Sequence, residues 1–231
     1  MATDLPIIEL RGVNHTFTMG IGQKLKVLKD VDLSLYADEV VALLGPSGSG
    51  KSTCLRILAG LLSPTDGEVI VNGNALDGPN PHVSMVFQNY ALLPWLTVFE
   101  NVELALEPHE LDKGEVRARV KRAIDLVGLE GFEEAYPKEL SGGMKQRVGI
   151  ARALVMERPV ICLDEPFTSL DVLSAETLRS EVLNIWLSKK TATKTLVLVT
   201  HNITEAAWFA KRILVMGTNP GHIRLSIKND L

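Results

Sequence analysis

The sequence predicts an α/β fold: a mostly parallel sheet covered by helices, with an N-terminal antiparallel β portion and an inserted helical subdomain. Three observations predict it. The first forty residues alternate short apolar stretches with turns, uninterrupted apolar runs recur further along, and stretches of helical periodicity separate those runs. Alternating helices and buried strands are typical of a parallel sheet with helices on both faces. With 231 residues, the chain is long enough to bury about 70% of its unfolded surface.

The strands follow from two patterns. Alternation of apolar and polar residues indicates half-buried strands at 7–10 and 27–35, whereas the continuous apolar run at 40–44 indicates a fully buried strand. A helix over 52–62 follows, because its leucines fall on one side and a Pro- and Gly-containing turn ends it. Further strands are predicted over 68–73, 160–163, 195–199 and 212–216.

The middle of the chain has a different character. Val116, Val120, Ile124 and Val127 recur near helical spacing, with basic residues on the other faces. After residue 140 the α/β alternation returns, with helices predicted over 144–156, 174–188 and beyond Thr204. We therefore expect a single domain over 1–231, with a nucleotide-binding core at 1–87 and 141–231 and a helical subdomain at about 88–140.

Composition and charge exclude several classes of protein. Hydrophobic residues make up 46% and charged residues 23%, which is ordinary for a globular protein and not for a disordered or fibrous one. The 24 Lys and Arg against 28 Asp and Glu give a net charge of −4, so we expect no nucleic-acid partner. Cys54 and Cys162 lie in apolar surroundings, which predicts buried, reduced thiols.

Targeting segments are not expected. The longest uninterrupted apolar stretch, 40–44, is far shorter than the ~20 residues of a membrane helix. The N-terminus lacks the basic start and apolar run of a secretion signal. We therefore expect a cytoplasmic chain with no signal peptide and no transmembrane helix.

A glycine-rich loop follows the buried strand at 40–44 and matches the pattern Gly-x4-Gly-Lys-Ser/Thr. Glycines let the backbone curl around phosphate oxygens with its N–H groups inward, and the next helix directs its positive end at the same anion. Lys51 supplies a cation, and the Ser52 hydroxyl can ligate Mg²⁺. The alternative is a Gly/Ser turn with an accidental lysine. The predicted contacts of a nucleoside triphosphate here are Gly45, Pro46, Ser47, Gly48, Ser49, Gly50, Lys51, Ser52 and Thr53.

Two carboxylates end the apolar strand at 160–163. Asp164 lies where open α/β sheets bind their ligands, and it can hold Mg²⁺ through water. Glu165, one residue on, can polarise an attacking water as a general base. The alternative is a strand end with two solvated acids.

A second anion-binding helix start is predicted at Ser141, Gly142 and Gly143. If both phosphate seats served one nucleotide within a monomer, one would be redundant. Our hypothesis is that two subunits sandwich ATP head-to-tail and that hydrolysis needs the pair. An ordinary helix cap is the alternative.

The order of these motifs resembles the ATPase subunit of ATP-binding-cassette (ABC) transporters, over about residues 7–222. The resemblance implies a P-loop NTPase core that binds ATP and Mg²⁺. It implies that Phe17 stacks on adenine, although the family more often has Tyr there. It implies that Gln88 touches Mg²⁺ and the attacking water and that His201 is the switch histidine at the γ-phosphate. Without the resemblance, core packing would be expected for Phe17 and a structural hydrogen bond for His201.

The same resemblance implies a signature segment and a loop that crosses between subunits. The signature contains Ser141, Gly142, Gly143 and Gln146, with Met144 and Lys145 where the commonest form has glutamines. Asp171 falls in the crossing loop. The implied metal ligands are Ser52, Gln88 and Asp164, and the implied catalytic residues are Glu165, His201 and Gln88.

Residues 92–102, 141–153 and 219–223 together resemble importers of the nitrate, sulfonate, taurine and bicarbonate group. Leu92, Leu93, Pro94 and Trp95 form an apolar stretch on a turn, a suitable socket for a short helix of a membrane subunit. The alternative is that Trp95 caps the core of the helical subdomain.

We therefore expect a subunit whose ATP-driven dimerisation and hydrolysis power a membrane importer of a small anion, at the cytoplasmic face of the plasma membrane. The implied partners are a second ATPase subunit, identical or a close paralogue, permease subunits contacting 88–95, and an external solute-binding protein. The alternatives are a soluble cassette ATPase of DNA repair or translation, or an export or lipid-transport subunit. The transported solute and a regulatory domain beyond Leu231 stay open.

Overall fold

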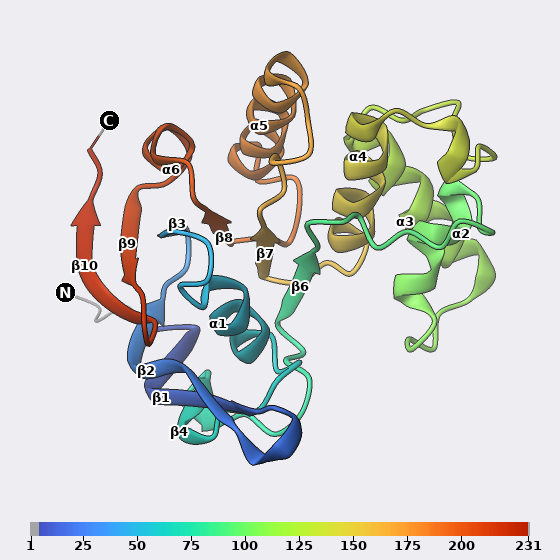
Figure 1. Ribbon diagram of the computed structural model, residues 1–231. Helices are drawn as coiled ribbons and strands as arrows, with labels where there is room; N and C mark the ends of the chain where they lie inside the picture. The colour runs from blue at the N-terminus through green and yellow to red at the C-terminus, as the bar shows by residue number, and fades with distance from the viewer. Residues whose placement is uncertain (1–4, 231) are drawn as a thin grey trace. The chain divides into compact units, whose positions relative to one another are not determined.

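The computed structural model describes residues 5–230, which form two compact units (Figure 1). Unit 1 comprises Met1–Val83 and Lys194–Leu231, and unit 2 comprises Ser84–Thr193. These units do not test the predicted division into a nucleotide-binding core at 1–87 and 141–231 and a helical subdomain at about 88–140. That division stays a prediction.

Unit 1 contains the predicted antiparallel β portion. Its four strands have the order β2-β1-β4-β5, and β1 pairs antiparallel with both β2 and β4. Ile8, Leu10 and Val13 of β1 are buried, as the apolar alternation predicts. The strands are β1 (Ile8–Thr18), β2 (Lys24–Leu35), β4 (Asp66–Val71) and β5 (Asn74–Ala75), with a 3-10 turn at Gly20–Gly22.

A second set of strands in unit 1 has the order β10-β9-β3-β8. The fully buried run at 40–44 is β3 (Val40–Leu44), which pairs in parallel with β8 (Thr195–Thr200) on one edge and β9 (Arg212–Gly217) on the other. Helices α1 (Lys51–Leu58) and α6 (Ile203–Phe209) complete the unit. The parallel pairing confirms the predicted α/β class.

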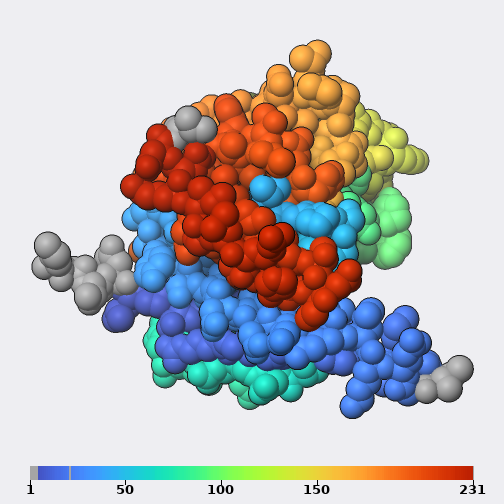
Figure 2. Space-filling view, turned by 60° about the vertical axis from the view of Figure 1, so that its left-hand side comes forward, coloured from blue at the N-terminus to red at the C-terminus, as the bar shows by residue number. Residues whose placement is uncertain are grey.

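Strand β10 (His222–Lys228), which no sequence pattern predicts, pairs antiparallel with β9. Its side chains are mostly exposed, so the strand lacks the apolar run that marked its neighbours. Figure 2 shows the C-terminal strands (red) lying on the blue strands of the N-terminal sheet. There, Lys29 N donates a 2.9 Å hydrogen bond to Gly221 O.

Unit 2 is mostly helical. Its strand β7 (Val160–Asp164) is the neighbour of β6 (Val83–Val86). The helical periodicity around residue 120 is confirmed, with Val120 and Ile124 buried in α3. The helices are α2 (Val98–Glu103), α3 (Lys113–Leu126), α4 (Gly142–Leu154) and α5 (Val172–Leu187), with 3-10 turns at Leu104–Leu106 and Pro137–Glu139.

Both cysteines are buried and neither forms a disulfide, as predicted. Burial in α1 raises the pKa of the Cys54 thiol to about 12, which keeps it neutral at physiological pH. Within residues 5–230, no helix has the length and apolar character that crossing a membrane requires.

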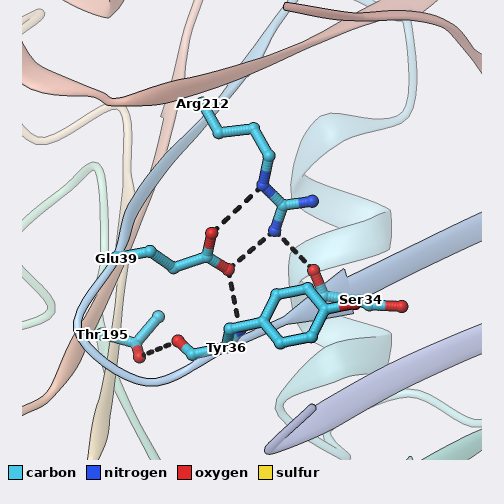
Figure 3. Close-up of polar contacts among 5 residues, drawn as sticks. All are labelled: Ser34, Tyr36, Glu39, Thr195 and Arg212. Atoms are coloured by element: carbon cyan, nitrogen blue, oxygen red, sulfur yellow. Dashed lines mark hydrogen bonds and ion pairs between the residues drawn. The ribbon is translucent and has the colours of Figure 1, made fainter. Parts of the chain in front are cut away.

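A half-buried ion pair ties three segments of unit 1 together (Figure 3). The Arg212 guanidinium on β9 donates to both carboxylate oxygens of Glu39, at 3.1 and 2.7 Å, and also to Ser34 O at the end of β2. The Glu39 carboxylate also accepts a 2.7 Å hydrogen bond from Tyr36 N. The turn between β2 and β3 is thereby fixed to β9, and Thr195 Oγ1 of β8 donates to Tyr36 O at 2.6 Å.

Replacing this carboxylate should destabilise unit 1. We expect Glu39→Ala to lower the free energy of unfolding by about 2–3 kcal/mol, because the Arg212 guanidinium loses its bidentate partner away from bulk water. Urea unfolding followed by circular dichroism measures the change. Asp230→Ala, which breaks the exposed pair of Lys228 and Asp230, is the control and should cost at most about 1 kcal/mol. An equal loss of unfolding free energy in the two variants would show that the ion pair of Arg212 and Glu39 stabilises unit 1 no more than an exposed ion pair does.

Candidate functional site

The glycine-rich loop of unit 1 begins where β3 ends. Gly45 N donates a 3.3 Å hydrogen bond to Thr200 O, which extends the pairing of β3 with β8 by one residue. Ser49 N donates to Pro46 O at 3.2 Å, closing a turn inside the loop. Gly48 and Gly50 have φ angles of +79° and +85°, a left-handed conformation that favours glycine. The loop therefore turns back on itself directly before α1.

The start of α1 differs from every other α-helix start in the described chain. The other five helices each have a side chain that accepts a hydrogen bond from a first-turn N–H: Thr97, Asp112, Ser141, Asp171 and Asn202. The residue before α1 is Gly50, which has no side chain and therefore forms no side-chain cap. The first N–H groups of a helix need acceptors and carry its positive dipole end. An anion at this loop would supply those acceptors.

Lys51 is held against the loop that precedes it. Its side chain is buried, and Nζ donates to Gly45 O at 2.8 Å and to Pro46 O at 3.0 Å. The Ser49 hydroxyl is also buried, and it has no hydrogen-bond partner among the described residues. Ser52 and Thr53 are half-buried in the first turn of α1. A buried ammonium and a buried hydroxyl without a partner fit a loop built to receive phosphate oxygens.

A second turn packs against this loop, and the sequence analysis did not assign it a role. Gly221 N donates to Val27 O at 2.8 Å, and a Cβ added at Gly221 would lie 2.1 Å from Ser49 O. Only glycine permits this approach of two backbones. In the sequence, the stretch at 219–223 carries a family resemblance but no local pattern that predicts this contact.

Two further predicted residues lie in unit 1. The Phe17 ring is 39% exposed, and the ring of buried His15 packs edge-on to it with centroids 4.5 Å apart. The exposed part of Phe17 could contact a planar base. His201 is exposed directly after β8, whose last residue Thr200 pairs with Leu44 beside the loop. The fold thus brings the position of His201 to the loop end of β3.

Unit 2 holds the predicted carboxylates. Asp164 is buried as the last residue of β7, and Glu165 follows it in a left-handed conformation with φ +45°. Such a backbone is unfavourable for a non-glycine residue and is common at functional sites. Gln88 Nε2 and Thr168 Oγ1 each donate to Glu165 Oε2 at 3.4 Å. Gln88 and Glu165, 77 residues apart in sequence, are therefore neighbours.

The signature segment and the crossing loop also meet in unit 2. Ser141 caps α4 by accepting a 3.3 Å hydrogen bond from Met144 N. Tyr90 OH is 2.9 Å from Ser169 Oγ, and a Cβ added at Gly142 would lie 3.3 Å from Tyr90 OH. Tyr90, which the sequence analysis passed over, therefore joins the segments at 88–90, 141–143 and 169–171.

Two charged residues, one in these segments and one bound to them, have lowered pKa values. Asp171 caps α5, and its hydrogen bonds from the Ser174 side chain and backbone hold its pKa below the usual value. Arg152 on α4 donates to Tyr90 O and Ala91 O at 2.9 and 2.6 Å, and burial lowers its pKa. Arg152 thus fixes the left-handed backbone at 90–91, which follows Gln88 in the chain. No local sequence pattern predicts this role.

Gln146 stands apart from the other signature residues. Its side chain is 0% exposed, and neither amide atom has a hydrogen-bond partner among the described residues. Ser141 is exposed, and Gly142 and Gly143 are half-buried at the start of the same helix. The structure therefore brings the start of the signature to the surface but keeps Gln146 inside.

The apolar turn after Gln88 is largely exposed. Trp95 is 68% exposed and Pro94 is exposed, whereas Leu92 and Leu93 are half-buried. The buried amide of Asn101 holds the turn by donating to the carbonyl oxygens of Leu93, Leu96 and Thr97 at 2.9–3.1 Å. This exposure does not fit the alternative in which Trp95 caps the core of the helical subdomain.

The predicted metal ligands suit Mg²⁺ by chemistry. Ser52, Gln88 and Asp164 offer a hydroxyl, an amide and a carboxylate, all oxygen donors. Mg²⁺ commonly uses one or two such groups together with substrate phosphates and water. Among residues 5–230, no group of three His, Cys, Asp or Glu side chains could form a metal site by itself. The donors therefore fit a metal that arrives with a nucleotide.

A methyl group added at Gly50 tests whether the shape of the glycine-rich loop matters for ATP binding, apart from the strain that any side chain causes in a left-handed backbone. Gly50→Ala places a Cβ 2.6 Å from Leu28 Cδ2 in a left-handed backbone. We expect at least about tenfold weaker ATP binding by isothermal titration, because losing 1.4 kcal/mol of phosphate contacts has that effect. Gly73→Ala is the matched control, since its φ is +82° and nothing lies within 4 Å of an added Cβ. Similar ATP affinities of the two variants would contradict a phosphate-binding role for the loop.

Comparison with known proteins identifies the family of this chain. The ABC transporter family matches residues 28–168. An uncharacterized ABC transporter ATP-binding protein of Methanocaldococcus jannaschii is 44% identical over 91% of this chain and 78% of its own length. The taurine import ATP-binding protein TauB of Pelagibacter ubique is 42% identical over 92% of this chain and 79% of its own. The aliphatic sulfonates import ATP-binding protein SsuB of Bacillus thuringiensis is 42% identical over 97% and 86%.

A solved structure extends the comparison to three dimensions. The dimeric post-hydrolysis structure of the ATP-binding cassette MJ0796, bound to ADP and Pi, has a TM-score of 0.84 and 34% identity, over 97% of this chain and 99% of that one. The matched family covers more than half of the 231 residues, including the glycine-rich loop and both carboxylates. The chain therefore belongs to the ABC transporter family, as an ATP-binding subunit that hydrolyses ATP.

Proposed function

We propose that this chain works as one of two ATPase subunits that close head-to-tail around ATP and power the import of a small anion of the sulfonate class. The observation that carries the proposal is a chain of contacts within unit 2: Gln88 donates to Glu165, and Tyr90 lies next to both Ser169 and Gly142. These contacts join motifs that lie far apart in the sequence, and a shared part in ATP-driven closure of the dimer accounts for their meeting.

The glycine-rich loop would bind the triphosphate. The first-turn N–H groups of α1 and the Lys51 ammonium would donate to phosphate oxygens, with Phe17 stacking on the base. The loop carbonyls that hold Lys51 keep its charge near where the phosphates would lie. Mg²⁺, held by Ser52, Asp164 and Gln88, would neutralise charge that develops on the phosphates.

Glu165 would act as the general base. Its carboxylate oxygen accepts hydrogen bonds from Gln88 and Thr168, which orient it. A carboxylate in this position can take a proton from the water that attacks the γ-phosphate. Gln88 would orient the same water, and His201 would contact the γ-phosphate.

The start of α4 would serve the nucleotide of the second subunit. Ser141 is exposed, and the two glycines after it leave the helix N-terminus open to an anion. The dimer of MJ0796 with ADP and Pi supports a two-subunit arrangement. Asp171 would lie in the loop that crosses between the subunits, beside exposed Val172 and Leu173. Gln146, which is buried, would support the signature from inside.

The importer assignment rests on relatives and on one surface. Two of the similar proteins are named for taurine import and for aliphatic sulfonates import. Exposed Trp95 with Pro94, in the turn that follows Gln88 in the sequence, offers an apolar contact for a permease subunit. We place the working subunit at the cytoplasmic face of the membrane, and an external solute-binding protein would deliver the anion.

Removing the base should trap the closed dimer. We expect Glu165→Gln to bind ATP, to form an ATP-dependent dimer in size-exclusion chromatography, and to hydrolyse ATP at least about 100-fold more slowly, within the range for general-base catalysis. Adding Ser141→Arg should abolish that dimer without affecting ATP binding to the monomer, because the arginine would fill the second phosphate seat. Ser141→Ala is the control, since it removes only the helix cap. Parental turnover in Glu165→Gln would rule out this base, and a surviving dimer with Ser141→Arg would rule out the sandwich.

Affinity purification of the chain from its native membranes in mild detergent should recover a polytopic membrane protein. Trp95→Ser should lower that recovery without changing ATP binding, because Trp95 is exposed and lies outside the phosphate loop. Mass spectrometry identifies the proteins that co-purify. Recovery with ribosomes or DNA and no membrane protein would support the soluble-ATPase alternative instead.

A further inference from the structure

A small pocket in unit 2 has a cationic rim and an apolar floor. It has a volume of about 190 Å³ and lies between α3, the end of α4 and the turn at 190–192. None of its lining residues is a candidate contact of ATP or Mg²⁺. One water needs only about 10–15 Å³ of such space, whereas drug-sized ligands need about 300 Å³ or more. The pocket therefore suits a small molecule.

The charges on the rim favour an anion. The lining residues include three cations, Arg119, Arg122 and Lys190, and one carboxylate, Glu157. Arg119 is already paired, at 3.3 Å from Glu157 and 2.6 Å from Glu115. Within residues 5–230, neither Arg122 nor Lys190 takes part in an ion pair. Two unpaired positive charges thus face the same small space.

The floor is apolar. Ala123 of α3, Leu154 at the end of α4 and Val155 are buried, and Leu126 is half-buried. An inorganic ion alone would leave this surface in contact with water, whereas a short hydrocarbon chain would cover it. The pocket therefore combines the two environments that an amphipathic anion needs.

Thr191 supplies a hydrogen-bond donor at the rim. Its hydroxyl is buried and has no partner among the described residues, although Thr191 lines the pocket. An oxyanion head group would give it the acceptor it lacks.

We propose that this pocket binds a small amphipathic anion, with a sulfonate- or phosphate-type head at Arg122, Lys190 and Thr191 and a short hydrocarbon chain on the floor. Binding at this site goes beyond the proposed function and does not depend on it. The bound anion would contact both α3 and the turn at 190–192. Its binding would therefore stabilise the helical part of unit 2.

Titration calorimetry with 1-butanesulfonate on the whole chain at low ionic strength tests this proposal. We expect saturable binding that Arg122→Gln/Lys190→Gln weakens at least about tenfold, the loss of about 1.4 kcal/mol of charge-assisted contacts. Arg117→Gln/Lys121→Gln is the matched control: it removes the same charge from exposed positions of α3 outside the pocket. Equal losses in the two double variants, or no saturable binding by the parent chain, would overturn the proposal.

Further probes identify the class of ligand. The titrations are repeated in the Lys51→Ala background, because a phosphate loop can also bind small anions. Binding that disappears with Lys51→Ala would place the anion at the loop and overturn the pocket. Titration with butyl phosphate tests whether the pocket also takes a phosphate-type head group. Inorganic sulfate should bind at least about tenfold more weakly than 1-butanesulfonate, since each buried CH₂ contributes about 0.8 kcal/mol. Sulfate that binds as tightly as 1-butanesulfonate would contradict the role of the apolar floor.

Discussion

The pairing of β3 on both edges is the constraint on which the rest of unit 1 depends. Strand β3 pairs in parallel with β8 on one edge and β9 on the other, and its side chains from Val40 to Leu43 are buried, so this strand is apolar throughout. The strand's end therefore has a fixed position, and Gly45 continues its pairing to Thr200. The glycine-rich loop, which begins at this strand end, therefore has a fixed starting position. The Arg212 ion pair with Glu39 fixes the other end of the strand.

Helix starts distinguish structure from function in this chain. Where a helix start serves only the fold, the preceding residue supplies a capping oxygen, as Thr97 and Asp112 do. At α1 the cap residue is Gly50, which has no side chain and forms no side-chain cap. Ser141 is intermediate, because it caps α4 yet is exposed with two glycines after it. The absence of a cap marks a place for a ligand more sharply than the presence of glycine.

Unit 2 gathers polar residues through a few long-range contacts. Tyr90 approaches both Ser169 and Gly142, Gln88 reaches Glu165, and Arg152 holds the backbone between them. A change at any of these contacts would move several motifs together. The amphipathic pocket of unit 2 involves none of them, so an anion there would act through the packing of α3 and α4 and not on the reacting atoms.

Local patterns were enough to predict the class of the fold, strand β3, helix α3, the glycine-rich loop and the position of the two carboxylates, because each has an apolar period, a glycine spacing or a charge pattern of its own. The folded chain was needed to reveal the approach of Gly221 to Ser49, the contact of Tyr90 with Ser169, the burial of Gln146 and the existence of β10. Those features arise where segments distant in sequence pack together. No local period records such packing, because its energy depends on partners that the chain brings together only when folded.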